Sequence, residues 1–315
     1  MSTNPVVSAR YVDPHTYPRG VAYLDGQYVP MEEAKVSVLD WGFLHSDATY
    51  DTVHVWKGRF FRLDQHLDRF AESMARLHMS LPLDRDAIRD ILHNCAALSG
   101  HDDAYVEMIC TRGASPTFSR DPRDAVNRFM AFAVPFGSVA NAEQLRRGLR
   151  LAITNVVRIP PSSVDPHIKN YHWLDLVHSL YDAYDAGAET ALVRDAQGNI
   201  AEGPGFNVFV AQHGALLSPA HGVLAGITRA AVIDLCAELE IPCTLGPVSA
   251  DALRGADEVF ISSTAGGIMP VTVVDGAPIG AGEIGPLTQR LQDAYWAKHT
   301  DPAWSEPVQL RSRPT

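Results

Sequence analysis

Short apolar runs joined by tight turns constrain the fold of this chain most strongly. Residues 21–30 contain two such runs about Asp25-Gly26, and residues 51–62 contain two about Lys57-Gly58. A glycine at such a turn, between stretches rich in β-branched and aromatic residues, is typical of a β-hairpin. The sequence therefore predicts two hairpins near its start.

Helical periodicity follows the second hairpin. Apolar residues recur every three or four positions over 63–77 and again over 88–95, just before Gly100. This spacing predicts two amphipathic helices. With strands expected at 103–112 and 127–136, the first half is predicted to be α+β.

In the second half, short expected strands are interleaved with expected helices, which predicts a mixed α/β domain. We expect strands near 148–154, 190–194, 206–212 and 257–263. We expect helices near 172–186, 227–240 and 285–298. A chain of 315 residues exceeds what one hydrophobic core usually organises, so two domains are expected. The predicted order is an N-terminal arm at 1–20, a small α/β domain at 21–136, an interdomain linker at 137–147, a large domain at 148–300 and a mobile C-terminal tail at 301–315.

Composition excludes several classes of function. The net charge of −11 disfavours nucleic acid and anionic membrane surfaces as partners. Neither a signal peptide nor a membrane-spanning run is visible, so a cytoplasmic protein is expected. The four cysteines, Cys95, Cys110, Cys236 and Cys243, lack the spacing of a zinc or disulfide framework. We expect no metal site, and we interpret the four as buried free thiols.

Lys169 is the first candidate for chemistry. It is one of only four lysines and lies between the apolar Ile168 and a helix that opens near Tyr171. Partial burial would favour its neutral, nucleophilic amine. From this context alone, an ordinary structural lysine remains an open alternative.

Three further segments carry polar groups at the ends of expected elements. Glu202 follows a turn and could hold a heteroaromatic nitrogen protonated, or it could be a solvated turn residue. Thr228 and Gly226 open an expected helix, whose free N–H groups suit a phosphate. Within residues 261–271, Ser263, Thr264 and the Gly266-Gly267 pair could supply further hydroxyl and backbone donors, although a plain strand–turn–strand would look the same.

Together these segments resemble the fold type IV pyridoxal-phosphate enzymes, which include the branched-chain and D-amino acid aminotransferases, the aminodeoxychorismate lyases and the (R)-selective amine transaminases. The resemblance rests on Glu202, on Asn207-Val208-Phe209 and on Gly226-Ile227 with Arg229. Pro204 departs from the family pattern, which prefers a smaller residue, and Ser218 stands where threonine is common. The similarity spans roughly residues 20–298 and implies an N-terminal α/β sandwich and a C-terminal pseudo-barrel α/β domain.

The resemblance also implies roles for individual residues. Lys169 would form a Schiff base with pyridoxal 5'-phosphate, Glu202 would pair with the ring nitrogen, and Leu224 would pack on the ring. The implied phosphate-binding set is Arg69, Ile227, Thr228, Ser263 and Thr264. Arg69 lies off the apolar stripe of its helix, so periodicity alone makes it a solvent-facing residue.

The expected substrate specificity depends on the strand DAYVEMICTRG. Glu107 stands where the branched-chain enzymes resemble one another in having an arginine. A glutamate there would repel a substrate carboxylate, which favours an amine donor without one. The segments HSDATYDTVHVW, RFFRLDQH, YVE and IKNYHWLDL also look like those of the (R)-selective amine transaminases. That resemblance implies a pocket lined by His45, Tyr50, Tyr105, Glu107 and Trp173, although each could serve packing instead.

The predicted function is amino transfer from a primary (R)-amine to a keto acid such as pyruvate. Of the loop arginines Arg120, Arg123 and Arg128, we favour Arg120 for the acceptor carboxylate. The main alternative is a D-amino acid or branched-chain amino acid aminotransferase. A lyase of the aminodeoxychorismate type and a non-catalytic protein of this fold are also open. Family members resemble one another in pairing as homodimers, so a homodimer is expected.

Overall fold

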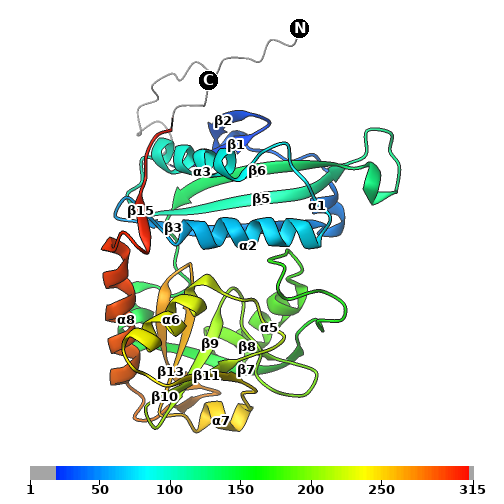
Figure 1. The fold of residues 1–315 in the computed structure, drawn as a ribbon. Coiled ribbons are helices and arrows are strands. Elements are labelled where there is room, and N and C mark those ends of the chain that lie inside the picture. Colours follow the sequence, from blue (N-terminus) through cyan, green and yellow to red (C-terminus); the bar gives the residue numbers. More distant parts are fainter. Residues whose placement is uncertain (1–18, 312–315) are drawn as a thin grey trace. The chain divides into compact units, whose positions relative to one another are not determined.

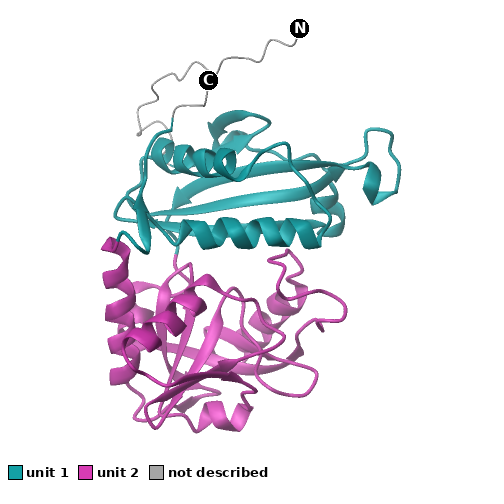
Figure 2. Ribbon diagram, viewed as in Figure 1, with its two compact units in different colours: residues 1–137, 302–315 teal, residues 138–301 magenta. Residues whose placement is uncertain are grey.

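The computed structural model describes residues 19–311 and divides the chain into two compact units (Figure 2). Unit 1 comprises residues 1–137 and 302–315, and unit 2 comprises residues 138–301. The N-terminal arm expected at 1–20 lies almost wholly outside the described residues. Each unit has its own sheet and its own buried apolar cluster.

Unit 1 is built on a seven-stranded sheet in the order β15-β4-β3-β5-β6-β1-β2 (Figure 1). Its strands are β1 (Val21–Leu24), β2 (Gln27–Pro30), β3 (Ala48–Trp56), β4 (Arg59–Phe61), β5 (Ala104–Ala114), β6 (Val126–Pro135) and β15 (Ser305–Pro307). Its helices are the 3-10 turn η2 (Met31–Glu33), α1 (Trp41–His45), α2 (Leu63–Arg76), α3 (Arg85–Ser99) and the 3-10 turn η3 (Pro122–Asp124). The two predicted hairpins and both predicted helices are confirmed.

Residue alternation explains which face of this sheet is covered. Val53 and Val55 of β3 and Val106 of β5 share a buried cluster with the apolar stripes of α2 and α3. Because side chains alternate across a strand, Thr52 and its cross-strand partner Glu107 lie on the opposite face. The chain thus places polar, reactive side chains on the face that α2 and α3 leave uncovered.

Unit 2 is built on an eight-stranded sheet in the order β11-β10-β9-β12-β13-β7-β8, with β14 paired to β13. Its strands are β7 (Leu149–Val157), β8 (Thr190–Arg194), β9 (Asn207–Gln212), β10 (Ala215–Pro219), β11 (Cys243–Gly246), β12 (Glu258–Ser263), β13 (Gly267–Val274) and β14 (Ala277–Pro278). The pairs β10/β11, β13/β7 and β7/β8 are parallel, and the other pairs of this sheet are antiparallel. The predicted mixed α/β character is confirmed.

The helices of unit 2 are α4 (Ala142–Arg147), α5 (Leu174–Asp185), α6 (Ile227–Glu238), α7 (Ala250–Arg254), α8 (Pro286–Ala297) and the 3-10 turn η4 (Lys298–Thr300). Helix α5 packs on β7 and β8, and α8 packs on β13. Helix α6 contacts β11, β12 and α8. Over residues 19–311 every helix is too short or too polar to cross a lipid bilayer.

Two local expectations differ from the structure. The boundary between the two units falls after residue 137, at the start of the stretch 137–147 expected as a linker. The same stretch contains α4, because Asn141 and Gln144 form a capping box that starts a helix despite weak apolar periodicity. The tail, expected to be mobile, is ordered through residue 311 and forms β15 against β4. Trp304 explains the second difference, since its ring lies 3.8 Å from the guanidinium carbon of Arg62 and packs near Phe61.

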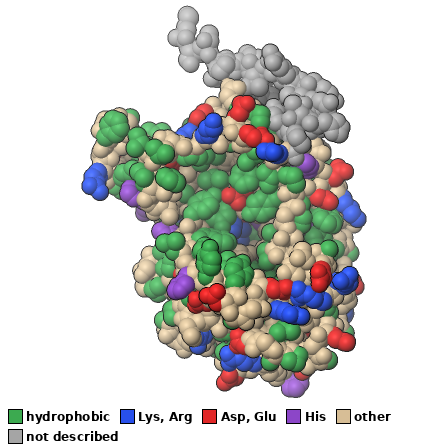
Figure 3. Space-filling view, turned by 180° about the vertical axis from the view of Figure 1, so that it is seen from behind, with side chains coloured by type: hydrophobic (Ala, Val, Ile, Leu, Met, Phe, Trp, Pro, Cys, Tyr) green, Lys and Arg blue, Asp and Glu red, His purple; other side chains and the backbone are tan. Residues whose placement is uncertain are grey.

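On the face drawn in Figure 3, charged side chains of both signs are mixed rather than segregated. Figure 3 shows acidic and basic side chains interspersed over one face of the molecule, with apolar side chains among them. Exposed large apolar residues include Phe43 and Phe118 in unit 1 and Leu174 and Tyr181 in unit 2.

Candidate active site

Glu202 is the buried acid of unit 2. It lies in the segment between β8 and β9 and is only 6% exposed. Arg158 donates from Nε to Oε1 at 3.0 Å, and the backbone N–H of Leu224 donates to Oε2 at 3.0 Å. Each carboxylate oxygen therefore has a donor from a different segment, which fixes the orientation of the side chain.

Arg158 joins this acid to a second one. It follows the end of β7, and its Nη1 donates to Oδ2 of Asp175 at 2.7 Å. Asp175 lies in the first turn of α5 and also accepts the N–H of Ile159 at 2.9 Å. The result is a buried Glu–Arg–Asp triad that ties β7, α5 and the Glu202 segment together.

Burial and nearby positive charge have opposite effects on the pKa of Glu202. Burial raises the pKa of Glu202, while Arg158, the Leu224 N–H and the charge of Lys169 oppose that rise. The net pKa lies above the ordinary value. A buried carboxylate in this state can share a proton with a ring nitrogen placed beside it.

Lys169 lies near this acid, since its charge acts on Glu202. It occupies the segment between β7 and α5 and is half-buried, beside the buried Ile168. Asn170 braces the segment by donating from Nδ2 to the carbonyl of Ile168 at 2.8 Å and by accepting the N–H of His172 at 2.9 Å. Unit 2 therefore contains both the amine and the buried carboxylate that the sequence singled out.

The segment that leads into α6 contacts Asn207. Asn207 donates from Nδ2 to the carbonyl of Leu224 at 3.0 Å, and Gly226 donates its N–H to the same carbonyl at 2.9 Å. A Cβ at Gly226 would lie 2.2 Å from Oδ1 of Asn207, so only glycine fits there. Within residues 19–311 no side chain caps α6, and Ile227 and Thr228 open it. A helix start of this kind can accept an anion at its first N–H groups.

The β12–β13 turn lies beside the Glu202 segment. Ser263 donates from Oγ to the carbonyl of Gly205 at 2.8 Å and accepts the N–H of Ala265 at 3.2 Å. Thr264 follows and is half-buried. A Cβ at Gly205 would lie 3.3 Å from the ring of Trp173, the residue that precedes α5. Ser263 and Trp173 therefore approach the same glycine.

The remaining candidates belong to unit 1. Thr52 donates to Oε2 of Glu107 at 3.0 Å, and the hydroxyl of Tyr105 donates to the same oxygen at 3.2 Å. Burial and the charge of Glu107 raise the pKa of Tyr105. Tyr50 is buried on β3, whereas His45 ends α1 and is exposed, with its ring 5.2 Å from that of Trp41.

The three loop arginines differ in their partners. Arg123 pairs with Asp121, and Arg128 pairs with Asp25. Arg120 is exposed, and within residues 19–311 it forms no ion pair.

Arg69 corrects an expectation from periodicity. Its side chain is 10% exposed rather than solvent-facing, and it forms a two-point ion pair with the fully buried Asp51, at 2.7 and 2.8 Å. His66 contacts the same carboxylate at 2.7 Å. The hydrophobic stripe could not reveal this, because Asp51 comes from β3.

Sequence reasoning missed Arg158 and Asp175. They lie 44 and 27 positions before Glu202, and Arg158 follows a strand without any motif that marks it. Asn207 belonged to the resemblance, but its contact with Leu224 was not foreseen. The sequence contains several arginines that could pair with Glu202, and no pattern in it selects Arg158.

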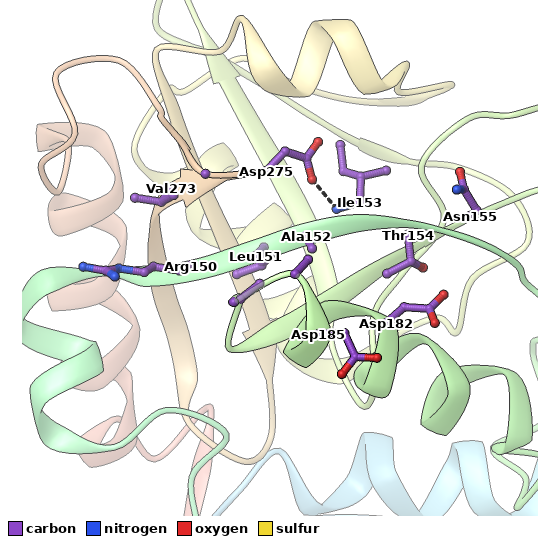
Figure 4. A pocket seen from close by; sticks show the side chains of 14 residues that line it. Arg150, Leu151, Ala152, Ile153, Thr154, Asn155, Asp182, Asp185, Val273 and Asp275 are labelled. Carbon is purple, nitrogen blue, oxygen red and sulfur yellow. Dashed lines mark hydrogen bonds between the residues drawn. The ribbon is translucent and has the colours of Figure 1, made fainter.

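A cavity of about 760 Å³ lies elsewhere in unit 2 (Figure 4). It is lined by β7, the end of α5 and the β13–β14 turn, where Asp275 accepts the N–H of Ile153 at 2.7 Å. Neither Lys169 nor Glu202 lines it.

Comparisons with known proteins agree with this arrangement. The family described as amino-transferase class IV matches residues 48–274. The chain is 31% identical over 276 residues to a putative branched-chain-amino-acid aminotransferase of Methanocaldococcus jannaschii, covering 87% of this chain and 94% of that protein. It is 26% identical over 276 residues to a D-alanine aminotransferase of Staphylococcus haemolyticus, covering 87% and 95%.

Solved structures show the same fold. The branched-chain amino acid aminotransferase of Thermoproteus uzoniensis, solved with norvaline, matches with a TM-score of 0.84 at 27% identity, over 92% of this chain and 100% of that one. The Escherichia coli branched-chain amino acid aminotransferase matches with a TM-score of 0.88 at 26% identity, over 92% and 100%. The predicted fold type IV architecture is confirmed, and the chain belongs to the amino-transferase class IV family.

Proposed function

We propose that this chain is a pyridoxal-phosphate-dependent aminotransferase in which Lys169 holds the cofactor covalently. The observation that carries the proposal is Glu202, a buried carboxylate with oriented donors on both oxygens and the charge of Lys169 nearby. Family membership and relatives named as aminotransferases support it.

The residues of unit 2 fit this cofactor. Glu202 would pair with the ring nitrogen, and Leu224 would pack on the ring. The start of α6, at Ile227 and Thr228, suits a phosphate because its N–H groups lack a side-chain cap among the described residues. We propose that Ser263 and Thr264 complete the phosphate set within unit 2.

Each residue then has a defined task. The bound cofactor supplies the electron sink for breaking a C–H bond beside the substrate nitrogen. Lys169, when its amine is neutral, takes that proton and returns it at a neighbouring atom. Glu202 keeps the ring nitrogen protonated, and Arg158 holds Glu202 in place.

For the amino donor, we favour an amino acid of the branched-chain or D-type. The relatives that support this are branched-chain and D-alanine aminotransferases. A primary (R)-amine is the second candidate, and Glu107 favours it, because a buried carboxylate would repel a donor carboxylate. Arg120 is our candidate for the acceptor carboxylate, since the other two loop arginines are already paired.

A donor panel separates these two candidates. The protein loaded with cofactor is mixed with L-leucine, D-alanine, (R)-1-phenylethylamine or (S)-1-phenylethylamine, and the visible absorbance of the cofactor is followed. Loss of the band with an amino acid, and recovery with a keto acid, supports the first candidate. Loss with the (R)-amine alone supports the second, and a band that no donor changes contradicts both.

Glu107→Gln tests the specificity argument within the same panel. The change removes the negative charge but keeps the shape and the hydroxyl contacts. If Glu107 disfavours donors with a carboxylate, the activity of the variant with amino acids should rise by about 10-fold or more relative to its activity with the amine. Equal effects on both donors contradict a role in specificity.

We also propose a homodimer, which light scattering of the purified protein tests.

A further inference from the structure

Two of the four cysteines differ from the others in their surroundings. Cys95 and Cys110 are buried in unit 1, where burial raises the pKa of both thiols, that of Cys110 to about 12. Cys236 is also buried, but Cys243 is half-buried and reachable. The expectation of four buried thiols is therefore wrong for Cys243.

The fold brings Cys236 and Cys243 together. Cys236 lies in the last turn of α6, and Cys243 begins β11, which α6 contacts. Between them the chain reverses sharply, with Glu240 in the left-handed region and the N–H of Ile241 donating to the carbonyl of Cys236 at 2.8 Å. The two thiols shift each other's pKa, as expected of neighbouring sulfurs.

A buried cation lies on the same face of α6 as Cys236. Arg229 lies two turns before Cys236 on the same face of α6 and is 7% exposed. Its guanidinium donates to Oγ of Ser218 at 3.1 Å and to the carbonyl of Pro219, both on β10, the strand next to β11. Its charge acts on Cys243.

These contacts divide the two thiols into different roles. The neighbouring thiol of Cys236 and the charge of Arg229 lower the pKa of Cys243 against the effect of burial. The neighbouring Cys243 and burial raise the pKa of Cys236. Cys243 is the more exposed of the two thiols and has the lower pKa, so it is the attacking thiol, with the buried Cys236 in position to resolve it.

We propose that Cys236 and Cys243 form a redox-active dithiol, a modification site whose oxidant is a peroxide. The thiolate of Cys243 attacks one peroxide oxygen, which breaks the O–O bond and leaves a sulfenic acid and, after protonation, water. The thiol of Cys236 then loses its proton and attacks the Cys243 sulfur, forming the disulfide and releasing a second water. Two thiols are oxidised, and one hydrogen peroxide is reduced to two waters.

The distribution of cleavage sites makes this testable in one digest. Trypsin leaves Cys236 and Cys243 together in the peptide 230–254, because neither Lys nor Arg lies between Arg229 and Arg254. The peptide 90–112 likewise contains both Cys95 and Cys110 and serves as an internal control.

The experiment uses the protein loaded with its cofactor. The folded protein receives hydrogen peroxide in small molar excess, is then unfolded, and its remaining thiols are alkylated. We expect peptide 230–254 to lose two hydrogen masses and to take up no alkyl group unless dithiothreitol is added first. Peptide 90–112 should be alkylated at both thiols. Alkylation of both peptides to the same extent overturns the proposal.

Single variants separate the two roles. In Cys236→Ser, Cys243 should stop at a sulfenic or more oxidised form without a disulfide. In Cys243→Ser, Cys236 should remain a thiol under the same dose. Cys95→Ser should behave as the parent protein. If Cys243→Ser leaves the oxidation of Cys236 unchanged, the assignment of Cys243 as the attacking thiol is overturned.

Discussion

Arg158 connects the carboxylates of Glu202 and Asp175, with N–O distances of 3.0 and 2.7 Å to the two acids. All three side chains are largely buried, so the arginine neutralises negative charge that would otherwise be costly. Because Asp175 opens α5 and Glu202 follows β8, this one residue holds two segments of the candidate site in register.

Arg158→Met should therefore damage both stability and cofactor affinity. Two buried acids without their cation would lose about 3–5 kcal/mol of unfolding free energy. The pKa of Glu202 should rise further, which weakens its hold on a protonated ring nitrogen. Urea unfolding and cofactor titration measure the two effects. Arg150→Met, at an exposed position on β7, is the control and should change neither.

Gly226→Ala should weaken cofactor binding by disturbing the start of α6. Its Cβ would collide with Oδ1 of Asn207 and displace the contact between Asn207 and Leu224. We expect a loss of about 1–3 kcal/mol in stability and weaker cofactor binding. Gly137→Ala, where a Cβ meets nothing within 4 Å, is the matched control. An unchanged cofactor affinity in Gly226→Ala would contradict the proposed role of the α6 start.

Asp51 predicts how unit 1 responds to acid. Burial alone would raise the pKa of Asp51, but Arg69 and His66 hold it well below its ordinary value. A group with a lowered folded pKa stabilises the protein above its unfolded pKa of about 4, and that stability is lost as pH falls further. Asp51→Asn should therefore cost about 3–5 kcal/mol near pH 7. Denaturant unfolding at several pH values should show the gap between the two proteins shrinking below about pH 4. If the difference in unfolding free energy between the two proteins stays constant with pH, the result would argue against this ion pair.

The C-terminal segment should contribute measurably to unit 1. Trp304 packs on Arg62 and Phe61, and Ser305 accepts from Nε of Arg59 at 2.9 Å. Trp304→Ala should lower the unfolding free energy by about 2 kcal/mol, since the ring is half-buried and also interacts with a cation. Thermal unfolding measures this, with Leu310→Ala as an exposed control. Equal stability of the two variants would show that the tail adds little.

Local patterns predicted the elements of this fold well where they repeat. The hairpins about Asp25-Gly26 and Lys57-Gly58 and the helices α2 and α3 follow from turn residues and apolar spacing. Local patterns did not predict helix α4 or strand β15. Helix α4 depends on a capping box, and β15 depends on pairing with β4, a strand more than two hundred residues away in the sequence.

The candidate site was less accessible to sequence reasoning. Local context singled out Lys169 and Glu202, and the resemblance gave them their expected roles. The ion pair of Arg158 with Glu202 joins residues 44 positions apart, and no local pattern encodes it. The same holds for Arg69 and Asp51, where only the folded sheet shows that a residue off the stripe is buried. Contacts between distant charges depend on tertiary structure.

Chemical trapping of the cofactor tests the central claim most directly. The protein is loaded with pyridoxal 5'-phosphate, reduced with borohydride, digested with trypsin and mapped by mass spectrometry, alongside Lys169→Ala and the exposed-lysine control Lys35→Ala. We predict a reduced cofactor on Lys169 in the parent and in Lys35→Ala, with cleavage at Lys169 blocked, and none at that site in Lys169→Ala, which should also lose transamination activity by about 100-fold or more. A cofactor trapped on another lysine, or activity that survives Lys169→Ala, would contradict the account.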